Sequence, residues 1–255
     1  MEDTRSTVAE YHRLPSNGFI YGVKYDPELK IRCMNTKDEM ILTSAKDTEY
    51  RKTLCEVLDS CVEGELPVST YDMCMGDFIF IMHKVRTITY GSKYKFTAGC
   101  PHCKKVQEAF LNLDDLKVNT IDGEITDKLI ITLPVSKDVI KLKLETPRIS
   151  DSIKAEATRR KESENLTYDP TMSIRIQTLV DTINGQVLES IQKEHYVDSM
   201  NARDSKYIIK KIEEINGLVG IDPAAIVKCS EESCGKEFLT FFRLGPEFFN
   251  PTIDE

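Results

Sequence analysis

The sequence predicts an α+β fold, and three observations support this class. Amphipathic helical segments and segments with strand-like alternation are interleaved along the 255 residues. Two pairs of closely spaced cysteines stand far apart in the chain, and each is followed by a strand-like segment. Hydrophobic residues make up 40% of the chain, which is enough for a folded core. We divide the chain into a mixed N-terminal part (1–91), a β part (92–146 and 226–255) and a long, largely helical insertion (147–225).

The N-terminal part is expected to contain two helices. Up to about Ser44 the chain is turn-rich and extended, with a turn cluster at 14–18 and a short strand at 29–34. A helix is predicted over 47–63, where apolar residues recur at helical spacing. A second helix is predicted over 72–88, and we expect it to lie in the core because its apolar residues fit one helical face.

The rest of the chain changes from strands to helices and back. Residues 92–113 have strand character around a central turn, and 129–133 and 139–144 are expected to pair as a hairpin. The pattern is helical from about 150 to 220. Within it, 154–165 is mostly charged and has little to bury, so we expect a solvated face or a mobile connection there. Two apolar stripes define the expected helices: Ile176, Leu179, Val180 and Ile183 form the first, and Ile208, Ile212, Ile215 and Val219 form the second.

Strand character returns after residue 226 and ends in an aromatic tail. Two interpretations are open for this tail. It could dock on a neighbouring subunit, or it could pack on its own β part. We favour the second, above all for the first two phenylalanines. The tail contains Phe238, Phe241, Phe242, Phe248 and Phe249.

The two cysteine pairs are the clearest chemical signal in the sequence. Cys100 and Cys103 have C-x2-C spacing, and Cys229 and Cys234 have C-x4-C spacing followed by Gly235. Both spacings are typical of structural zinc sites, because a short loop can turn both sulfurs towards one ion. The sequence therefore predicts a zinc ribbon, with each cysteine pair on a hairpin and one structural Zn²⁺ held by all four thiolates. The 125 residues between the pairs would then be an insertion into the ribbon.

A redox dithiol is the alternative interpretation of the first pair. Cys-Pro-His-Cys is a known kind of thioredoxin-like active-site sequence, and its intervening residues can lower a thiolate pKa. The expected βαβ context is not evident around 100–103, and the second pair would be left unexplained. We read His102 as an exposed residue rather than a ligand. The other cysteines lack paired spacing and are interpreted as structural: Cys33, Cys55, Cys61 and Cys74.

Composition and motifs argue against several other function classes. The net charge is −8, which removes the usual electrostatic reason to expect nucleic-acid binding, although a zinc ribbon that binds nucleic acid remains an alternative. The longest apolar run, 78–82, is far shorter than the roughly 20 residues of a membrane span. No secretory signal is visible, so we expect a cytosolic protein with reduced cysteines. Nucleotide-binding, hydrolase and metalloprotease motifs are absent from the sequence, so an enzyme is not expected.

The order of several short segments resembles a known family. The resemblance covers mainly residues 14–113, with weaker support from the cysteine pair at 229–234. Its pieces are 14–18 (LPSNG), 31–39 (IRCMNTKDE), 41–44 (ILTS), 53–54 (TL), 58–62 (LDSCV), 76–78 (GDF), 86–91 (RTITYG) and 100–103 (CPHC). Together they resemble the baseplate hub subunit or baseplate assembly protein family of T4-like contractile-tailed bacteriophages.

This resemblance implies a structural or assembly role without catalysis. It implies other phage tail and baseplate proteins as partners, in a homo- or hetero-oligomer. It also implies a location in the host cytoplasm during assembly or in the baseplate of the virion tail. A cytosolic, acidic chain with a structural metal site is consistent with such a scaffold.

Overall fold

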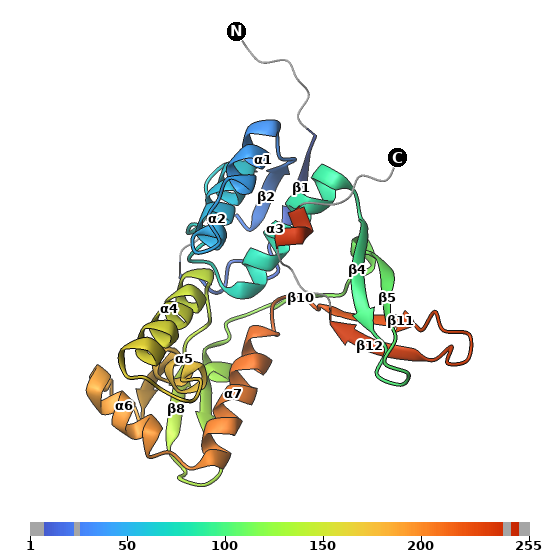
Figure 1. The fold of residues 1–255 in the computed structure, drawn as a ribbon. Coiled ribbons are helices and arrows are strands. Elements are labelled where there is room, and N and C mark those ends of the chain that lie inside the picture. The colour runs from blue at the N-terminus through green and yellow to red at the C-terminus, as the bar shows by residue number, and fades with distance from the viewer. Residues whose placement is uncertain (1–7, 23–25, 242–245, 250–255) are drawn as a thin grey trace.

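The computed structural model describes residues 8–22, 26–241 and 246–249 of the chain. Over this part the protein is a mixed α+β structure with seven α-helices and several small antiparallel sheets (Figure 1). The helices are α1 (Thr36–Thr43), α2 (Tyr50–Cys61), α3 (Met75–Tyr90), α4 (Pro147–Ser163), α5 (Thr171–Leu179), α6 (Ser190–Asp198) and α7 (Ala202–Asn216). The strands are β1 (Ala9–Arg13), β2 (Glu28–Arg32), β3 (Val62–Glu63), β4 (Lys93–Gly99), β5 (Val106–Asn112), β6 (Val118–Asn119), β7 (Ile130–Thr132), β8 (Val139–Leu142), β9 (Val180–Ile183), β10 (Gly220–Ile221), β11 (Ala224–Lys228) and β12 (Glu237–Phe241).

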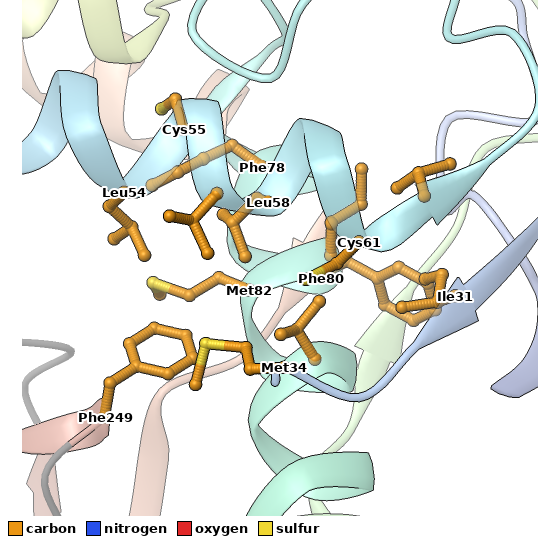
Figure 2. Close-up of a cluster of buried hydrophobic side chains, with 14 of the residues drawn as sticks. Ile31, Met34, Leu54, Cys55, Leu58, Cys61, Phe78, Phe80, Met82 and Phe249 are labelled. Atoms are coloured by element: carbon orange, nitrogen blue, oxygen red, sulfur yellow. The ribbon is translucent and has the colours of Figure 1, made fainter. Parts of the chain in front are cut away.

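The largest hydrophobic cluster lies where α2 and α3 pack beside the β1-β2-β3 sheet. Figure 2 shows Leu54 and Leu58 of α2 facing Phe78 and Met82 of α3. Their spacing of four residues puts each pair on one face of its helix, which is the face that the sequence pattern predicts. The predicted helices over 47–63 and 72–88 are therefore confirmed as α2 and α3.

Helix α1 lies in a segment that the sequence analysis expected to be extended. Asn35 caps it, because the Asn35 side chain accepts hydrogen bonds from the amides of Lys37 and Asp38. The Asp38 carboxylate in turn accepts from the Asn35 amide at 2.9 Å, which completes a capping box. Only Asp38 and Leu42 of this helix are buried, so its apolar pattern is too weak to indicate a helix, whereas the Asn-x-x-Asp spacing could have indicated its start.

A second cluster forms where the β7-β8-β9 sheet packs against α5, α6 and α7. The predicted hairpin over 129–144 is confirmed as β7 and β8, and its core side chains join this cluster. The predicted stripe from Ile176 to Ile183 is only partly helical. The helix α5 ends at Leu179, and the next four residues form β9, which pairs with β8. Asn184 and Gly185 follow with positive φ and turn the chain, so strand pairing ends the helix here.

The end of the aromatic tail packs on the N-terminal cluster rather than on the β part. Phe248 and Phe249 are both buried there, and Figure 2 shows Phe249 near Met34 and Met82. The buried Arg86 of α3 donates from Nε to the carbonyl oxygen of Phe248 at 2.9 Å. Phe238 is buried between the two cysteine hairpins, Phe241 is exposed, and Phe242 lies outside the described residues. Packing on its own hairpin is thus correct for Phe238 and wrong for Phe241.

A buried carboxylate joins the turn at 14–18 to the start of α3. Asp77 accepts from the Ser16 amide at 3.0 Å and from the Tyr21 hydroxyl at 2.7 Å. Burial raises the pKa of Asp77 above its ordinary value, because desolvation disfavours the charged carboxylate. The folded protein therefore holds the Asp77 proton more tightly than the unfolded chain does. The stability from this group is present below the unfolded pKa and is lost as pH rises through the folded pKa.

Two substitutions separate the hydrogen bonds of Asp77 from its charge. Asp77→Ala is expected to lower the free energy of unfolding by about 1–3 kcal/mol, because it leaves the Ser16 amide buried without an acceptor. Asp77→Asn keeps the acceptor and carries no charge, so we expect its stability relative to the native protein to rise between acid and neutral pH. Urea unfolding at several pH values measures both effects. An Asp77→Asn protein that loses stability relative to the native protein as pH rises would contradict this account.

Candidate metal centre

The two cysteine pairs lie at the turns of two β-hairpins. Cys100 and Cys103 connect β4 to β5, and Cys229 and Cys234 connect β11 to β12. The prediction that each pair stands on a hairpin is confirmed. The hairpins form two separate two-stranded sheets, so the structure does not establish the full topology of a zinc ribbon.

The two turns have equivalent backbone geometry. In the first, the Cys100 amide donates to the Lys105 carbonyl oxygen at 2.9 Å; in the second, the Cys229 amide donates to the Lys236 carbonyl oxygen at 2.9 Å. The residue before each acceptor has a left-handed backbone, with φ of 65° at Lys104 and 53° at Gly235. Glycine adopts this conformation without a Cβ penalty, as the sequence predicted for the second turn. A lysine at the equivalent position of the first turn gives no such signal.

The four sulfurs converge on one point although the pairs are far apart in sequence. All four Sγ atoms lie within 4.8 Å of one another. The Cys100 and Cys234 sulfurs are 3.9 Å apart, and those of Cys103 and Cys229 are 3.5 Å apart. A tetrahedron with Zn–S bonds of about 2.3 Å places its sulfurs about 3.8 Å apart. The arrangement therefore fits a metal ion bound by four thiolates, and each of these two contacts joins one cysteine of each pair.

Side chains next to the cysteines hold the two turns in register. The Gln107 side chain donates from Nε2 to the Lys228 carbonyl oxygen at 2.8 Å and accepts at Oε1 from the Ser230 amide at 2.7 Å. Lys105 forms an ion pair with Glu231 at 3.0 Å. Gln107 thus satisfies the backbone on both sides of Cys229. The sequence analysis missed this residue, because a single glutamine on a strand is not distinctive.

A small hydrophobic cluster lies between the two hairpins, next to the cysteines. It contains Ala98 and Ala109 from the first hairpin, and Val227 and Phe238 from the second. Cys100 and Cys229 are buried in the same cluster, Cys234 is half-buried, and Cys103 is exposed. The two alanines leave room for the Phe238 ring between the hairpins. The cluster is small beside the main core, so it leaves a substantial stabilising role for a bound ion.

Two thiols of the cluster, Cys100 and Cys229, have pKa values shifted in opposite directions. Desolvation raises the pKa of Cys100, but amides of Cys103 and His102 bond its sulfur and lower that pKa to about 7. An amide of Glu231 lowers the pKa of Cys229, but desolvation and the neighbouring thiols raise it to about 12. The Cys100 thiolate therefore forms readily, and ionisation of Cys229 beside it is disfavoured. A divalent cation would supply the compensating charge, so the donor set fits a metal in its electrostatics as well as its spacing.

The remaining cysteines and His102 lie outside this arrangement. Cys55, Cys61 and Cys74 are buried, and burial raises the pKa of each thiol to about 12, 11 and 12 respectively. Their interpretation as structural residues agrees with that burial. His102 is exposed, as predicted. The redox alternative gains no support, because Cys100 and Cys103 lie at a hairpin turn beside a second cysteine pair rather than at the start of a helix.

Comparison with known proteins decides the family. The model of a family described as T4 bacteriophage base plate protein matches residues 8–250 of the chain. The chain belongs to this family. The match includes the helical part after Pro147, where the sequence resemblance carried no weight. No curated protein and no solved structure matched in the companion comparisons.

Membership has direct consequences for the role of this baseplate protein. It implies a location in the phage tail and other tail proteins as partners, and it favours a structural role over an enzymatic one. Among the described residues, the baseplate protein has no helix that is long and apolar enough to cross a membrane. The family match confirms the prediction of a T4-like baseplate protein, and the convergence of the four sulfurs confirms that the two cysteine pairs lie together.

Proposed function

We propose that this baseplate protein is a structural or assembly component of the hub region, and that Cys100, Cys103, Cys229 and Cys234 hold a structural Zn²⁺. The observation that carries the metal proposal is the convergence of four Sγ atoms from two turns separated by 125 residues. Zinc is the metal that best suits four thiolates in a tetrahedron, and such a closed site leaves no position for catalysis. The hub assignment is supported by the resemblance of residues 14–113 together with the family match.

The metal would join the middle of the chain to its end. Both hairpins leave the N-terminal core, and the residues between them form the second hydrophobic cluster. When bound, the ion supplies a crosslink between hairpins that otherwise share a small hydrophobic cluster. Gln107 and the Lys105–Glu231 ion pair set the register of the two turns. This crosslink would keep the surface presented to neighbouring subunits in one geometry.

Complementation tests whether assembly requires the site. A phage that lacks this gene infects host cells that express the native protein or one of two variants in their cytoplasm. The variants are Cys234→Ser and, as the matched control outside the cluster, Cys33→Ser. We expect Cys234→Ser to lower the yield of complete tails at least about tenfold, since mutating a residue that only supports a metal ligand already costs roughly 10–100-fold in metal affinity or activity. Cys33→Ser should leave the yield unchanged. A fully active Cys234→Ser protein would contradict the role given to the site.

Chemical crosslinking tests the hub assignment. Baseplates and assembly intermediates are crosslinked and digested, and the crosslinked peptides are identified by mass spectrometry. The proposal predicts crosslinks between this chain and proteins at the central axis of the baseplate. Crosslinks only to proteins at the baseplate periphery would contradict a place in the hub. Detection in intermediates but not in complete virions would identify an assembly factor.

A further inference from the structure

The outer face of the β11–β12 hairpin exposes a stripe of large apolar side chains. The exposed fractions are 74% for Ile226, 60% for Leu239 and 64% for Phe241. The alternate residues Val227 and Phe238 point the other way and are buried against the first hairpin. The stripe is therefore the outer face of a strand pair whose inner face already packs on the β4–β5 hairpin. The hairpin also extends away from α5 and α6 (Figure 1).

The register of the hairpin gives this face a specific pattern. On the outer face Ile226 is directly paired with Leu239 across the strands. At the end near the cysteines, Lys228 is paired with Glu237, and at the other end Ala224 is paired with Phe241. One strand thus presents small, apolar and positive groups, and the other presents large, apolar and negative groups in the same order.

We propose that a second copy of this chain covers this face in a symmetric dimer. A two-fold axis parallel to the strands lays β11 of one copy over β12 of the other. Ala224 then faces the partner's Phe241, and Ile226 faces the partner's Leu239. Lys228 faces the partner's Glu237, and the same three contacts recur on the other side of the axis. Size and charge are complementary at every position of this arrangement.

The charges favour this axis over the other face-to-face arrangement. An axis across the strands would lay β11 over β11 and β12 over β12 in opposite directions. Lys228 would then face the partner's Ala224, and Glu237 would face the partner's Phe241. Each charge would then face an apolar residue of the partner and lose water without gaining a contact across the interface, which disfavours this axis even though Lys228 and Glu237 of one copy stand side by side. The strand-parallel axis pairs the charges instead, so it is the arrangement that the sequence of the hairpin selects.

The dimer is expected to be weak, because the face is only two strands wide. Specific interfaces usually bury about 800 Å² on each partner, and this face is smaller. We therefore expect weak association, with a dissociation constant on the order of 10 µM. The inference concerns the outer face of the hairpin and goes beyond the metal site on its inner side.

Sedimentation of the full-length, zinc-loaded protein tests the proposal first. Over about 1–200 µM we expect a concentration-dependent change from monomer to dimer. Leu239→Asp should remain monomeric throughout, because each dimer would bury two unpaired carboxylates. Ile191→Asp removes an equally exposed apolar side chain from α6 and should dimerise as the native protein does. Zinc content is measured for each variant, so that loss of the dimer is separated from loss of the metal site.

Charge reversal tests the axis itself. Lys228→Glu alone, or Glu237→Lys alone, places like charges opposite each other on both sides of the axis at the end near the cysteines, and each should weaken association at least about tenfold. A mixture of the two single variants should form a heterodimer, and the double variant Lys228→Glu/Glu237→Lys should recover the native affinity. A native protein that stays monomeric up to about 200 µM would overturn the proposal. A dimer that forms equally well in Leu239→Asp, or single variants that do not complement each other, would also overturn it.

Discussion

Replacing Cys103 or Cys234 by serine is expected to release the metal and to lower the melting temperature by similar amounts. The two cysteines belong to different turns, but their sulfurs belong to one cluster, so either loss opens the same site. A lost structural ion costs the folded state about 3 kcal/mol or more. At this chain length each kcal/mol corresponds to about 2–4 °C, so we expect a decrease of at least about 6–12 °C. Calorimetry and metal analysis on the same samples measure both effects.

Cys33→Ser is the matched control for these variants. Cys33 is a free, half-buried cysteine outside the cluster, and its replacement should leave the metal content unchanged. If only one of the two cluster variants loses metal, the two cysteine pairs do not share an ion. If neither variant loses metal, the cluster is not a metal site at all.

Gly76→Ala is expected to be strongly destabilising. Gly76 lies in the first turn of α3, where the chain of β10 crosses it, and a Cβ built on Gly76 would overlap the Val219 carbonyl group. The next residue, Gly220, has a φ of 99°, and a Cβ built on it would in turn meet the backbone of Gly76. Alanine would otherwise favour a helix by about 1 kcal/mol. The clash is with backbone atoms that cannot rotate away, so we expect a net loss of about 3 kcal/mol.

Urea unfolding of Gly76→Ala and Gly123→Ala measures the cost of this contact. A Cβ on Gly123 would meet no atom within 4 Å, and its φ is not positive, so Gly123→Ala should change stability by less than about 0.5 kcal/mol. An equally small effect at Gly76 would show that α3 and β10 are not in backbone contact. The close contact would then not be what joins the inserted part to the N-terminal core.

The sequence was sufficient where one local pattern determines the outcome. The apolar spacing in 47–63 and 72–88 predicted α2 and α3, and strand alternation predicted the hairpins. The spacing of the cysteine pairs predicted the cluster, because short loops present both sulfurs on one side. Each of these signals depends only on residues close together in the chain.

Features that depend on distant partners could not be predicted in the same way. Val180 and Ile183 continue the apolar stripe of α5, and only pairing with β8 makes them a strand. Phe248 follows the second hairpin, and no pattern near it in the sequence indicates where it packs. It packs on the N-terminal core, where Arg86 donates a hydrogen bond to its carbonyl oxygen. Gln107 acquires its role only when the second turn lies beside it.

Metal analysis combined with thiol counting tests the central claim most directly. The purified native protein is analysed for bound metals by mass spectrometry, and its reactive thiols are counted before and after addition of a chelator. The account predicts one zinc per chain and four thiols that become reactive only after the chelator is added. No bound metal, with Cys100 and Cys103 freely reactive or joined in a disulfide, would contradict it.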